Sequence, residues 1–219
     1  MNIERRFTKF EDSKIECRAD ENENKQISGL GVVFYDGTPN TEYNLFEDYY
    51  ERIDSGAFDE VLKSADARGL FNHDTNMLLG RMSAGTMRLD KSKGGINYEI
   101  DMPDTTIGRD VHESIKRGDI TGSSFSFIAD KIEWSSEKRD SGNVEIRTIT
   151  SIKSLYDVGP VTFPAYESTT TSARTKEAIE NERKELENER NDTDDTDLEL
   201  AKAKKDRDLD LINIQLKKV

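Results

Sequence analysis

One short stretch of this chain carries hydroxyl groups in a setting that suits nucleophilic chemistry. It runs from Gly118 to Ile128, beginning as a Gly-Asp turn and continuing as a strand. Side chains alternate across a strand, so we expect Phe125 and Phe127 on one face and Ser124 and Ser126 on the other. Two buried Phe rings would hold a serine rigidly on the opposite face, which suits a nucleophile if a base lies within reach. The plain alternative is a serine-rich edge strand.

A serine nucleophile needs a base, and the chain contains two histidines. His73 follows the apolar pair Leu70 and Phe71, and we expect it at a strand end, where functional groups often meet a cleft. His112 falls within a predicted helix, next to Val111 and Glu113, and we expect it on the side of that helix rather than on its buried face. A neutral imidazole can take the serine proton and pass it to the leaving amine. A packed or surface histidine without a chemical role is the alternative for His73.

The imidazole in turn needs an acidic partner. Asp74 is adjacent to His73, but neighbouring strand side chains point to opposite faces, so Asp74 is badly placed for this role. Asp157 lies among apolar residues in the last predicted strand of the domain. A partly buried carboxylate needs a partner, and an imidazole N–H would serve. The candidate set is therefore His73, Ser124 and Asp157, although Asp157 would also suit a structural role.

Oxyanion stabilisation, metals and cofactors are the remaining chemical questions. Backbone N–H groups near 122–124 or the Arg81 guanidinium could meet an oxyanion, and Arg81 suits a structural ion pair equally well. His73, Asp74 and His112 lack the helical spacing of a metal site, so we predict no metal. The chain has neither a G-x-G-x-x-G motif nor a phosphate-binding loop, and we predict no cofactor.

Composition limits the class of protein. The chain has 219 residues with 33% hydrophobic and 35% charged residues, so we expect part of it to be poorly packed. A net charge of −13 argues against binding nucleic acid through a basic face. Cys17 is the only cysteine, which excludes an internal disulfide and fits a reducing cytoplasm. No apolar run is long enough for a bilayer and Met1–Phe10 is no secretory signal, so we expect a soluble protein without a membrane partner.

Strands dominate the predicted elements before the serine stretch. The glycines in one of them, 26–34, suggest a bulge or a curved, barrel-like path. A helix capped by Ser55 should follow, and two later segments should pair as a hairpin. The predicted elements are a charged edge strand at 3–17, strands at 26–34, 46–53, 69–74 and 78–81, a helix at 56–63, and hairpin strands at 86–89 and 95–102.

A helix and two β-rich segments surround the serine stretch. The helix should run over 105–117 with Gly118 as its stop. The segment 144–152 is β-rich, and 155–166 reads as the last strand of the domain. Pro160 and Pro164 should break that strand, which favours an edge or a bulge.

The composition changes after Thr169–Ser172, which predicts a folded domain over 1–174 and a charged tail over 175–219. The tail contains no Gly, Pro or aromatic residue, and its 10 basic and 14 acidic residues contribute −4 of the net charge. A heptad-like spacing links Leu209, Ile212, Leu216 and Val219 for barely more than one heptad. We expect a partly helical appendage that orders with a partner rather than a stable coiled coil.

Six segments, taken in order along the chain, are similar to a known family. They are 27–34, 53–58, 70–74 with 79–81, 102–110 (MPDTTIGRD), 117–125 (RGDITGSSF) and 158–166 (VGPVTFPAY). Together they resemble the prohead (procapsid maturation) proteases of tailed bacteriophages, which are related to the herpesvirus assembly proteases. The resemblance covers roughly 27–173.

The resemblance implies a fold and a set of roles. The fold would be α+β, mainly β: a closed, mostly antiparallel barrel surrounded by helices. His73 would be the general base, and Ser124 rather than Ser123 the nucleophile, because it directly precedes Phe125. Two positions depart from the family pattern: Asp157 stands where Glu is frequent, and Ser126 where Gly is usual. The related herpesvirus enzymes use a second histidine as third member, which keeps His112 as an alternative.

The resemblance also implies a place and partners. It predicts a serine endopeptidase that cuts scaffold or capsid-protein extensions. The cutting would take place inside the immature prohead, in the host cytoplasm. The resemblance also predicts that the protease cuts itself, with the tail 175–219 as a segment removed on maturation. Capsid protein and scaffold would be its partners, without direct contact to nucleic acid, and a homo-oligomer is compatible with this role. The alternative is a non-enzymatic assembly protein that works through its acidic tail. An unrelated host hydrolase domain is disfavoured by the ordered segments.

Overall fold

The computed structural model describes residues 3–8, 15–19, 25–163 and 176–185. The chain divides into two units, Met1–Tyr166 and Glu167–Val219, which are described separately. In the second unit residues 176–185 form a helix. The predicted boundary at 174/175 and the heptad-like positions 209–219 lie outside the described residues and stay predictions.

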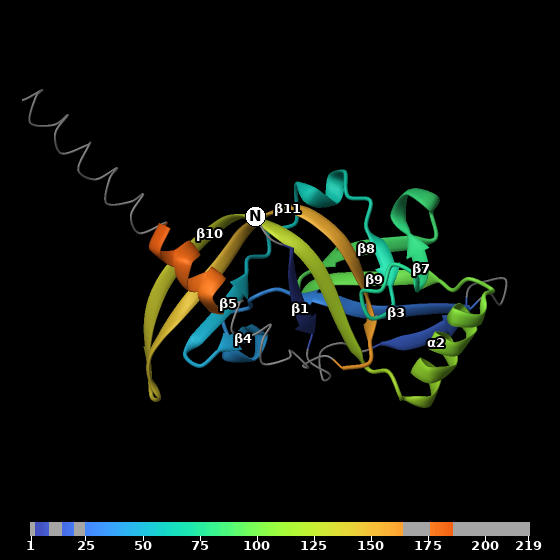
Figure 1. Ribbon diagram of the computed structural model, residues 1–219, viewed down its shortest axis with the longest axis horizontal. Coiled ribbons are helices and arrows are strands. Elements are labelled where there is room, and N and C mark those ends of the chain that lie inside the picture. Colours follow the sequence, from blue (N-terminus) through green and yellow to red (C-terminus); the bar gives the residue numbers. More distant parts are fainter. Residues whose placement is uncertain (1–2, 9–14, 20–24, 164–175, 186–219) are drawn as a thin grey trace, which may run out of the picture. The chain divides into compact units, whose positions relative to one another are not determined.

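Two β-sheets and the helix α2 form the framework of the first unit (Figure 1). The larger sheet has the order β1-β10-β11-β5-β4, and β6 joins β11 to β7; the smaller sheet has the order β2-β3-β9-β8. The fold is therefore mainly β with helices, as predicted. The strands are β1 (Glu4–Thr8), β2 (Glu16–Ala19), β3 (Lys25–Val33), β4 (Tyr43–Phe46), β5 (Tyr49–Ile53), β6 (Arg68–Leu70), β7 (Leu78–Arg81), β8 (Met87–Ser92), β9 (Gly95–Asp101), β10 (Gly122–Arg139) and β11 (Gly142–Val161); α2 spans Thr106–Arg117, and short 3-10 turns span Pro39–Thr41, Val61–Lys63 and Met82–Ala84.

The predicted closed barrel is wrong. Within the described residues neither sheet closes on itself: β2 and β8 are the edges of the smaller sheet, and β1 and β4 end the main path of the larger one. The glycines that suggested a barrel serve close packing instead. A Cβ atom on Gly31 would lie 2.3 Å from a methyl group of Val158, so glycine lets β3 approach β11.

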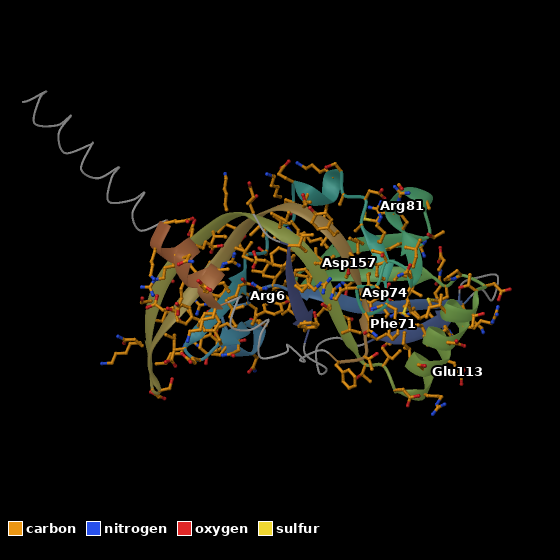
Figure 2. The ribbon with its side chains drawn as sticks, in the orientation of Figure 1. Arg6, Phe71, Asp74, Arg81, Glu113 and Asp157 are labelled. Atoms are coloured by element: carbon orange, nitrogen blue, oxygen red, sulfur yellow. The ribbon has the colours of Figure 1, made fainter. Side chains whose placement is uncertain are left out.

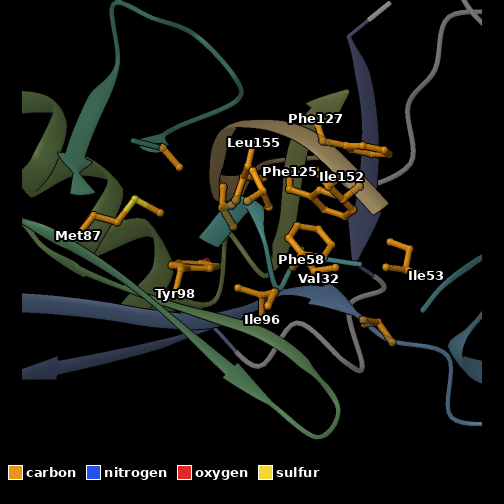
Figure 3. Close-up of a cluster of buried hydrophobic side chains, with 14 of the residues drawn as sticks. Val32, Ile53, Phe58, Met87, Ile96, Tyr98, Phe125, Phe127, Ile152 and Leu155 are labelled. Carbon is orange, nitrogen blue, oxygen red and sulfur yellow. The ribbon is translucent and has the colours of Figure 1, made fainter. Parts of the chain in front are cut away.

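One hydrophobic core joins the two sheets (Figure 3). Phe125 and Phe127 lie on the core face of β10, as the alternation predicts, with stacked rings whose centroids are 5.0 Å apart. Large side chains from other elements enclose them, and all are essentially inaccessible to solvent. They include Val32, Ile53, Phe58, Ile96 and Tyr98.

Several local predictions need correction. The predicted strand 46–53 is divided between β4 and β5 by a turn at residues 47–48. The segment 3–17 is not one edge strand, because β1 joins the larger sheet and β2 the smaller. The predicted helix 56–63 is a series of turns ending in one 3-10 turn, because the Asp54 side chain accepts a hydrogen bond from the Gly56 amide at 2.7 Å and holds a turn. The segment 144–152 and residues 155–161 belong to one continuous strand, β11, which runs through Pro160 and ends at Val161; residues 164–166 of the predicted last strand lie outside the described residues.

Helix α2 and the hairpin β8–β9 follow the prediction closely. Thr105 caps the helix by accepting a hydrogen bond from the Gly108 amide at 3.2 Å, and Gly118 ends it in a left-handed conformation with φ 84°. No helix among residues 3–8, 15–19, 25–163 and 176–185 has the length and apolar character to span a bilayer.

A buried network of four charged side chains ties β1 to the larger sheet. Glu51 on β5 receives hydrogen bonds from Arg6 at 2.6 Å and from Arg147 on β11. Both guanidinium groups also bind Glu4, at 2.6 and 3.0 Å. Burial alone would raise the pKa of the Glu51 carboxyl, but the two guanidinium groups outweigh it and hold that pKa below its usual value.

We predict that Arg147→Met lowers the free energy of unfolding by about 3–5 kcal/mol, because it leaves a buried carboxylate with one counterion fewer. Urea unfolding at neutral pH measures this. Arg18→Met is the matched control: its pair with Glu16 is more than half exposed, so it should change stability by less than about 1 kcal/mol. Equal effects of the two substitutions would contradict a special role for the buried network.

Candidate active site

The register of β10 against β11 decides what faces the serine stretch. Ser124 lies opposite Gly159, and Ser126 lies opposite Asp157. Residues paired across an antiparallel ladder share a face, so both serines and Asp157 lie on the face away from the core phenylalanines. Ser123 lies on the core side, where its hydroxyl is 3.0 Å from the Tyr98 hydroxyl. The two adjacent serines therefore have different surroundings.

His73 reaches this face from the loop that follows β6. We predicted it at the end of a strand, but β6 ends at Leu70, and Asn72 and His73 both adopt left-handed conformations with φ 54° and 57°. Such conformations are strained for residues other than glycine and persist where the surroundings hold them. Here the Asn72 amide donates to the Pro160 carbonyl at 3.1 Å, and the Asn72 side-chain oxygen accepts from the Thr162 amide at 2.8 Å.

Gly159 allows the loop to come this close. A Cβ atom at this position would lie 2.4 Å from the Leu70 carbonyl oxygen and 3.2 Å from the Leu70 nitrogen. Both are backbone atoms, so no side-chain rotation could relieve the contact. The residue opposite Ser124 on β11 must therefore be a glycine if β6 is to bring His73 over the serine.

The three predicted side chains form one hydrogen-bonded chain. His73 Nδ1 lies 2.5 Å from Asp157 Oδ1, and His73 Nε2 lies 2.6 Å from Ser124 Oγ. A carboxylate only accepts hydrogen bonds, so the imidazole proton belongs on Nδ1, which leaves Nε2 as an acceptor for the serine. The His73 and Asp157 side chains are 6% and 8% exposed, so water hardly screens their interaction.

The other candidates lie elsewhere. Asp74 accepts hydrogen bonds from the backbone and side chain of Asn76 and closes its own turn, as its poor placement for catalysis suggested. Arg81 binds Asp66 at 2.9 and 3.1 Å, and this hydrogen bonding raises the pKa of Arg81. Figure 2 shows Arg81 well separated from Asp157 in the view. Its guanidinium is occupied by an ion pair.

His112 is buried on α2, and its carbonyl accepts a weak hydrogen bond from the Cys17 thiol at 3.4 Å. Burial, together with Lys25 and Lys116, lowers the pKa of His112. The structure thus brings Asp157 to His73, and His112 has a separate environment on α2; in Figure 2 its neighbour Glu113 is labelled at the lower right of the fold and Asp157 near the centre. Within the described residues, no group of three His, Cys, Asp or Glu side chains could hold a metal ion.

Two features of the site were not predicted from sequence. Strand β1 pairs with β10 so that Phe7 lies opposite Ser124, and the Phe7 ring meets the His73 ring edge to face at 6.3 Å. The Arg6 carbonyl accepts a hydrogen bond from Ser124 Oγ at 3.0 Å, and Ser124 is fully buried. The second feature is a hydrogen bond from the Ser126 hydroxyl to Asp157 Oδ2.

Neither feature left a usable sequence signal. The charged, loosely alternating pattern around Arg6 fits any edge strand, and its partner strand lies more than a hundred residues away. The departure at Ser126 was visible in the sequence, but its partner depends on the cross-strand register.

Comparisons with known proteins found a matching family and a similar solved structure. The family described as Caudovirus prohead serine protease matches residues 13–184, most of the chain. Among solved structures, the bacteriophage T4 capsid assembly protease is similar, with a TM-score of 0.41 and 11% identity over 74% of this chain and 99% of that chain. No curated protein sequence matches this chain.

We predict that Gly159→Ala disturbs the site more than an ordinary alanine substitution, because the added Cβ atom forces Leu70 and the His73 loop away from β11. We expect a loss of about 1–3 kcal/mol in the free energy of unfolding, typical of overpacking. Gly94→Ala is the matched control, since a Cβ atom there would meet nothing within 4 Å. Urea unfolding compares the two, and equal stability would contradict the close approach of β6 and β11.

Proposed function

Because this chain belongs to the caudovirus prohead serine protease family, we propose that it is a serine endopeptidase with Ser124 as nucleophile, His73 as general base and Asp157 as the carboxylate that orients the base. The observation that carries this proposal is the hydrogen-bonded chain from Asp157 through His73 to Ser124. A serine, an imidazole and a buried carboxylate in this sequence of contacts suit hydrolysis of a peptide bond through a serine nucleophile.

The proposed mechanism uses each contact once. Ser124 Oγ attacks the carbonyl carbon of the scissile peptide bond, and its proton passes to His73 Nε2. The carbon–nitrogen bond breaks as His73 gives this proton to the leaving amine. A water molecule then attacks the acyl carbon while His73 Nε2 takes its proton. His73 returns this proton to Ser124 Oγ as the bond between Ser124 and the acyl group breaks. Asp157 keeps the proton on Nδ1 and stabilises the imidazolium that forms.

The oxyanion that forms during attack needs hydrogen-bond donors. We propose backbone N–H groups around 122–124, next to the nucleophile, for this role. The alternative donor weighed from the sequence was Arg81. Its guanidinium binds Asp66 instead, which argues against that role.

The substrates we propose are the scaffold and capsid-protein extensions inside the prohead, in the host cytoplasm. We also propose that the chain cuts itself within the tail 175–219. We infer accessibility from composition alone: the tail is charged and has no aromatic residue to anchor a core, and segments outside a packed core are cleaved most readily.

Access to Ser124 is the main constraint on this function. The serine hydroxyl has a single hydrogen, and it cannot donate to His73 Nε2 and to the Arg6 carbonyl at the same time. The carbonyl therefore competes with the base for the serine proton. Ser124 is also fully buried, and we propose that β1, whose Arg6 carbonyl binds the serine hydroxyl, moves before a substrate carbonyl reaches Ser124. The described conformation is a resting state of the proposed enzyme.

We predict that self-cleavage stops in Ser124→Ala. Intact mass, followed over hours in concentrated protein and in cells that also make the capsid protein, should show loss of a C-terminal piece from the wild type. The variant should be slower by about 10⁴-fold or more, because no hydroxyl remains to form the acyl group. If both proteins are cut alike, Ser124 is not the nucleophile; if both stay whole in both settings, the non-enzymatic assembly protein is the better account.

We predict that Arg6→Met speeds modification of Ser124 by diisopropyl fluorophosphate, although it destabilises the protein. The substitution removes the cation that anchors β1 to Glu51, so β1 should leave the site more often. The rate should rise about tenfold for each 1.4 kcal/mol of anchoring lost. Arg5→Met, at an exposed neighbouring position, is the matched control and should react like wild type. A slower reaction in a folded Arg6→Met variant would contradict closure by β1.

A further inference from the structure

A second serine hydroxyl lies buried beside the three residues of the site. Ser126 is 2% exposed, lies directly opposite Asp157 in the β10–β11 ladder, and donates a hydrogen bond to Asp157 Oδ2. We propose that Ser126 is a positioning residue: it fixes the Asp157 carboxylate and, through it, the ring of His73. This inference rests on the proposed function of the site.

The geometry assigns one donor to each oxygen of the carboxylate. Oδ1 accepts from His73 Nδ1, and Oδ2 accepts from Ser126 Oγ. The two donors come from different elements, the loop after β6 and the strand β10. A carboxylate held at only one oxygen can rotate about its Cβ–Cγ bond, whereas two donors on separate elements fix its plane. The imidazole that binds Oδ1 then has one preferred orientation toward Ser124.

The local backbone explains why such a fixing contact is needed. The register of β10 and β11 shifts between Ser126 and Phe127, so that Phe127 pairs with Leu155 and Tyr156 is an extra residue on β11. This β-bulge lies immediately beside Asp157, and bulges bend a strand and redirect the side chains next to them. The Ser126–Asp157 pair is the last regular pair before the bulge. A side-chain hydrogen bond at that point holds the carboxylate in line despite the irregular ladder.

Burial makes this contact important for the charge as well. The Asp157 side chain is buried, so an oxygen without a donor would lack the hydration that an exposed carboxylate has. Ser126 supplies that missing donor. It is distinct from the proposed nucleophile because its hydroxyl binds the carboxylate, while the Ser124 hydroxyl binds the imidazole.

A direct test follows the His73 Nδ1 proton by NMR, which needs no substrate. The chain has only two histidines, so a protein labelled with ¹⁵N in the histidine rings gives two sets of imidazole signals, and His112→Gln assigns them. We expect a low-field Nδ1–H resonance from His73 in the wild type. In Ser126→Ala it should move upfield or broaden, because the carboxylate is no longer fixed. Ser126→Thr keeps a hydroxyl and should retain the resonance. Ser126→Val has the shape of the threonine variant without its hydroxyl and should lose the resonance.

The same variants are then treated with diisopropyl fluorophosphate. We expect Ser126→Ala and Ser126→Val to react about tenfold more slowly than wild type, the loss that one hydrogen bond of ordinary strength produces. Ser126→Thr should react faster than Ser126→Val. The matched control is Ser151→Ala, which removes another serine–aspartate bond between β10 and β11, at 3.2 Å to Asp130, and should react like wild type.

The two measurements separate the inference from the proposed function. If neither the wild type nor Arg6→Met reacts at all, the protease proposal fails, and the NMR signal alone decides whether Ser126 positions His73. If Ser126→Ala and Ser126→Val keep both the resonance and the wild-type rate, Ser126 is an ordinary buried serine. If all three variants, including Ser126→Thr, lose the resonance with equal loss of thermal stability, packing rather than the hydroxyl explains the effect, and the inference is also overturned.

Discussion

The register between β10 and β11 is the constraint on which the site depends. It sets Asp157 opposite Ser126 and a glycine opposite Ser124, two residues along the same face. A shift of one residue would turn every side chain of one strand to the opposite face, so the register and the core specify each other. Phe125 and Phe127 fill the core only in the register that also turns Ser124 toward His73. Packing on one face thereby fixes chemistry on the other.

Two further contacts convert this register into a complete site. The loop with His73 is strained at two consecutive residues, and its hydrogen bonds to the end of β11 hold it there. On the other side β1 pairs with β10 and is anchored by Arg6 in the buried ionic network. The first contact brings His73 to Ser124, and the second places the Arg6 carbonyl on the Ser124 hydroxyl. In the proposed mechanism β1 moves before a substrate reaches Ser124, so the anchoring of β1 opposes access to the serine.

Local patterns allowed part of this arrangement to be predicted from sequence. Alternation along β10 assigned Ser124 and Ser126 to the face opposite the phenylalanines, and the caps of α2 could be read from Thr105 and Gly118. The candidates His73, Ser124 and Asp157 came from residue chemistry and from the ordered family segments, and the structure brings their side chains within hydrogen-bond distance. Their catalytic roles remain a proposal.

The features that sequence did not predict depend on contacts between distant segments. The segment 3–17 contributes strands to two different sheets because β1 pairs with β10 and β2 pairs with β3. No local sequence pattern encodes these pairings. The turn at 54–57 arises because the Asp54 side chain competes with helix formation. The expected barrel rested on the resemblance and on glycines in β3, yet Gly31 is required for close contact with Val158 rather than for closure.

The most direct test of the central claim is to map which serine reacts. The protein is incubated with diisopropyl fluorophosphate, digested, and the peptide that spans β10 is sequenced by mass spectrometry. Ser123, Ser124 and Ser126 lie within four residues, but only Ser124 contacts the imidazole. The account predicts a single phosphoryl adduct, on Ser124, that is absent from His73→Ala. An adduct on Ser123 or Ser126, or one on Ser124 that forms equally fast without His73, would contradict it.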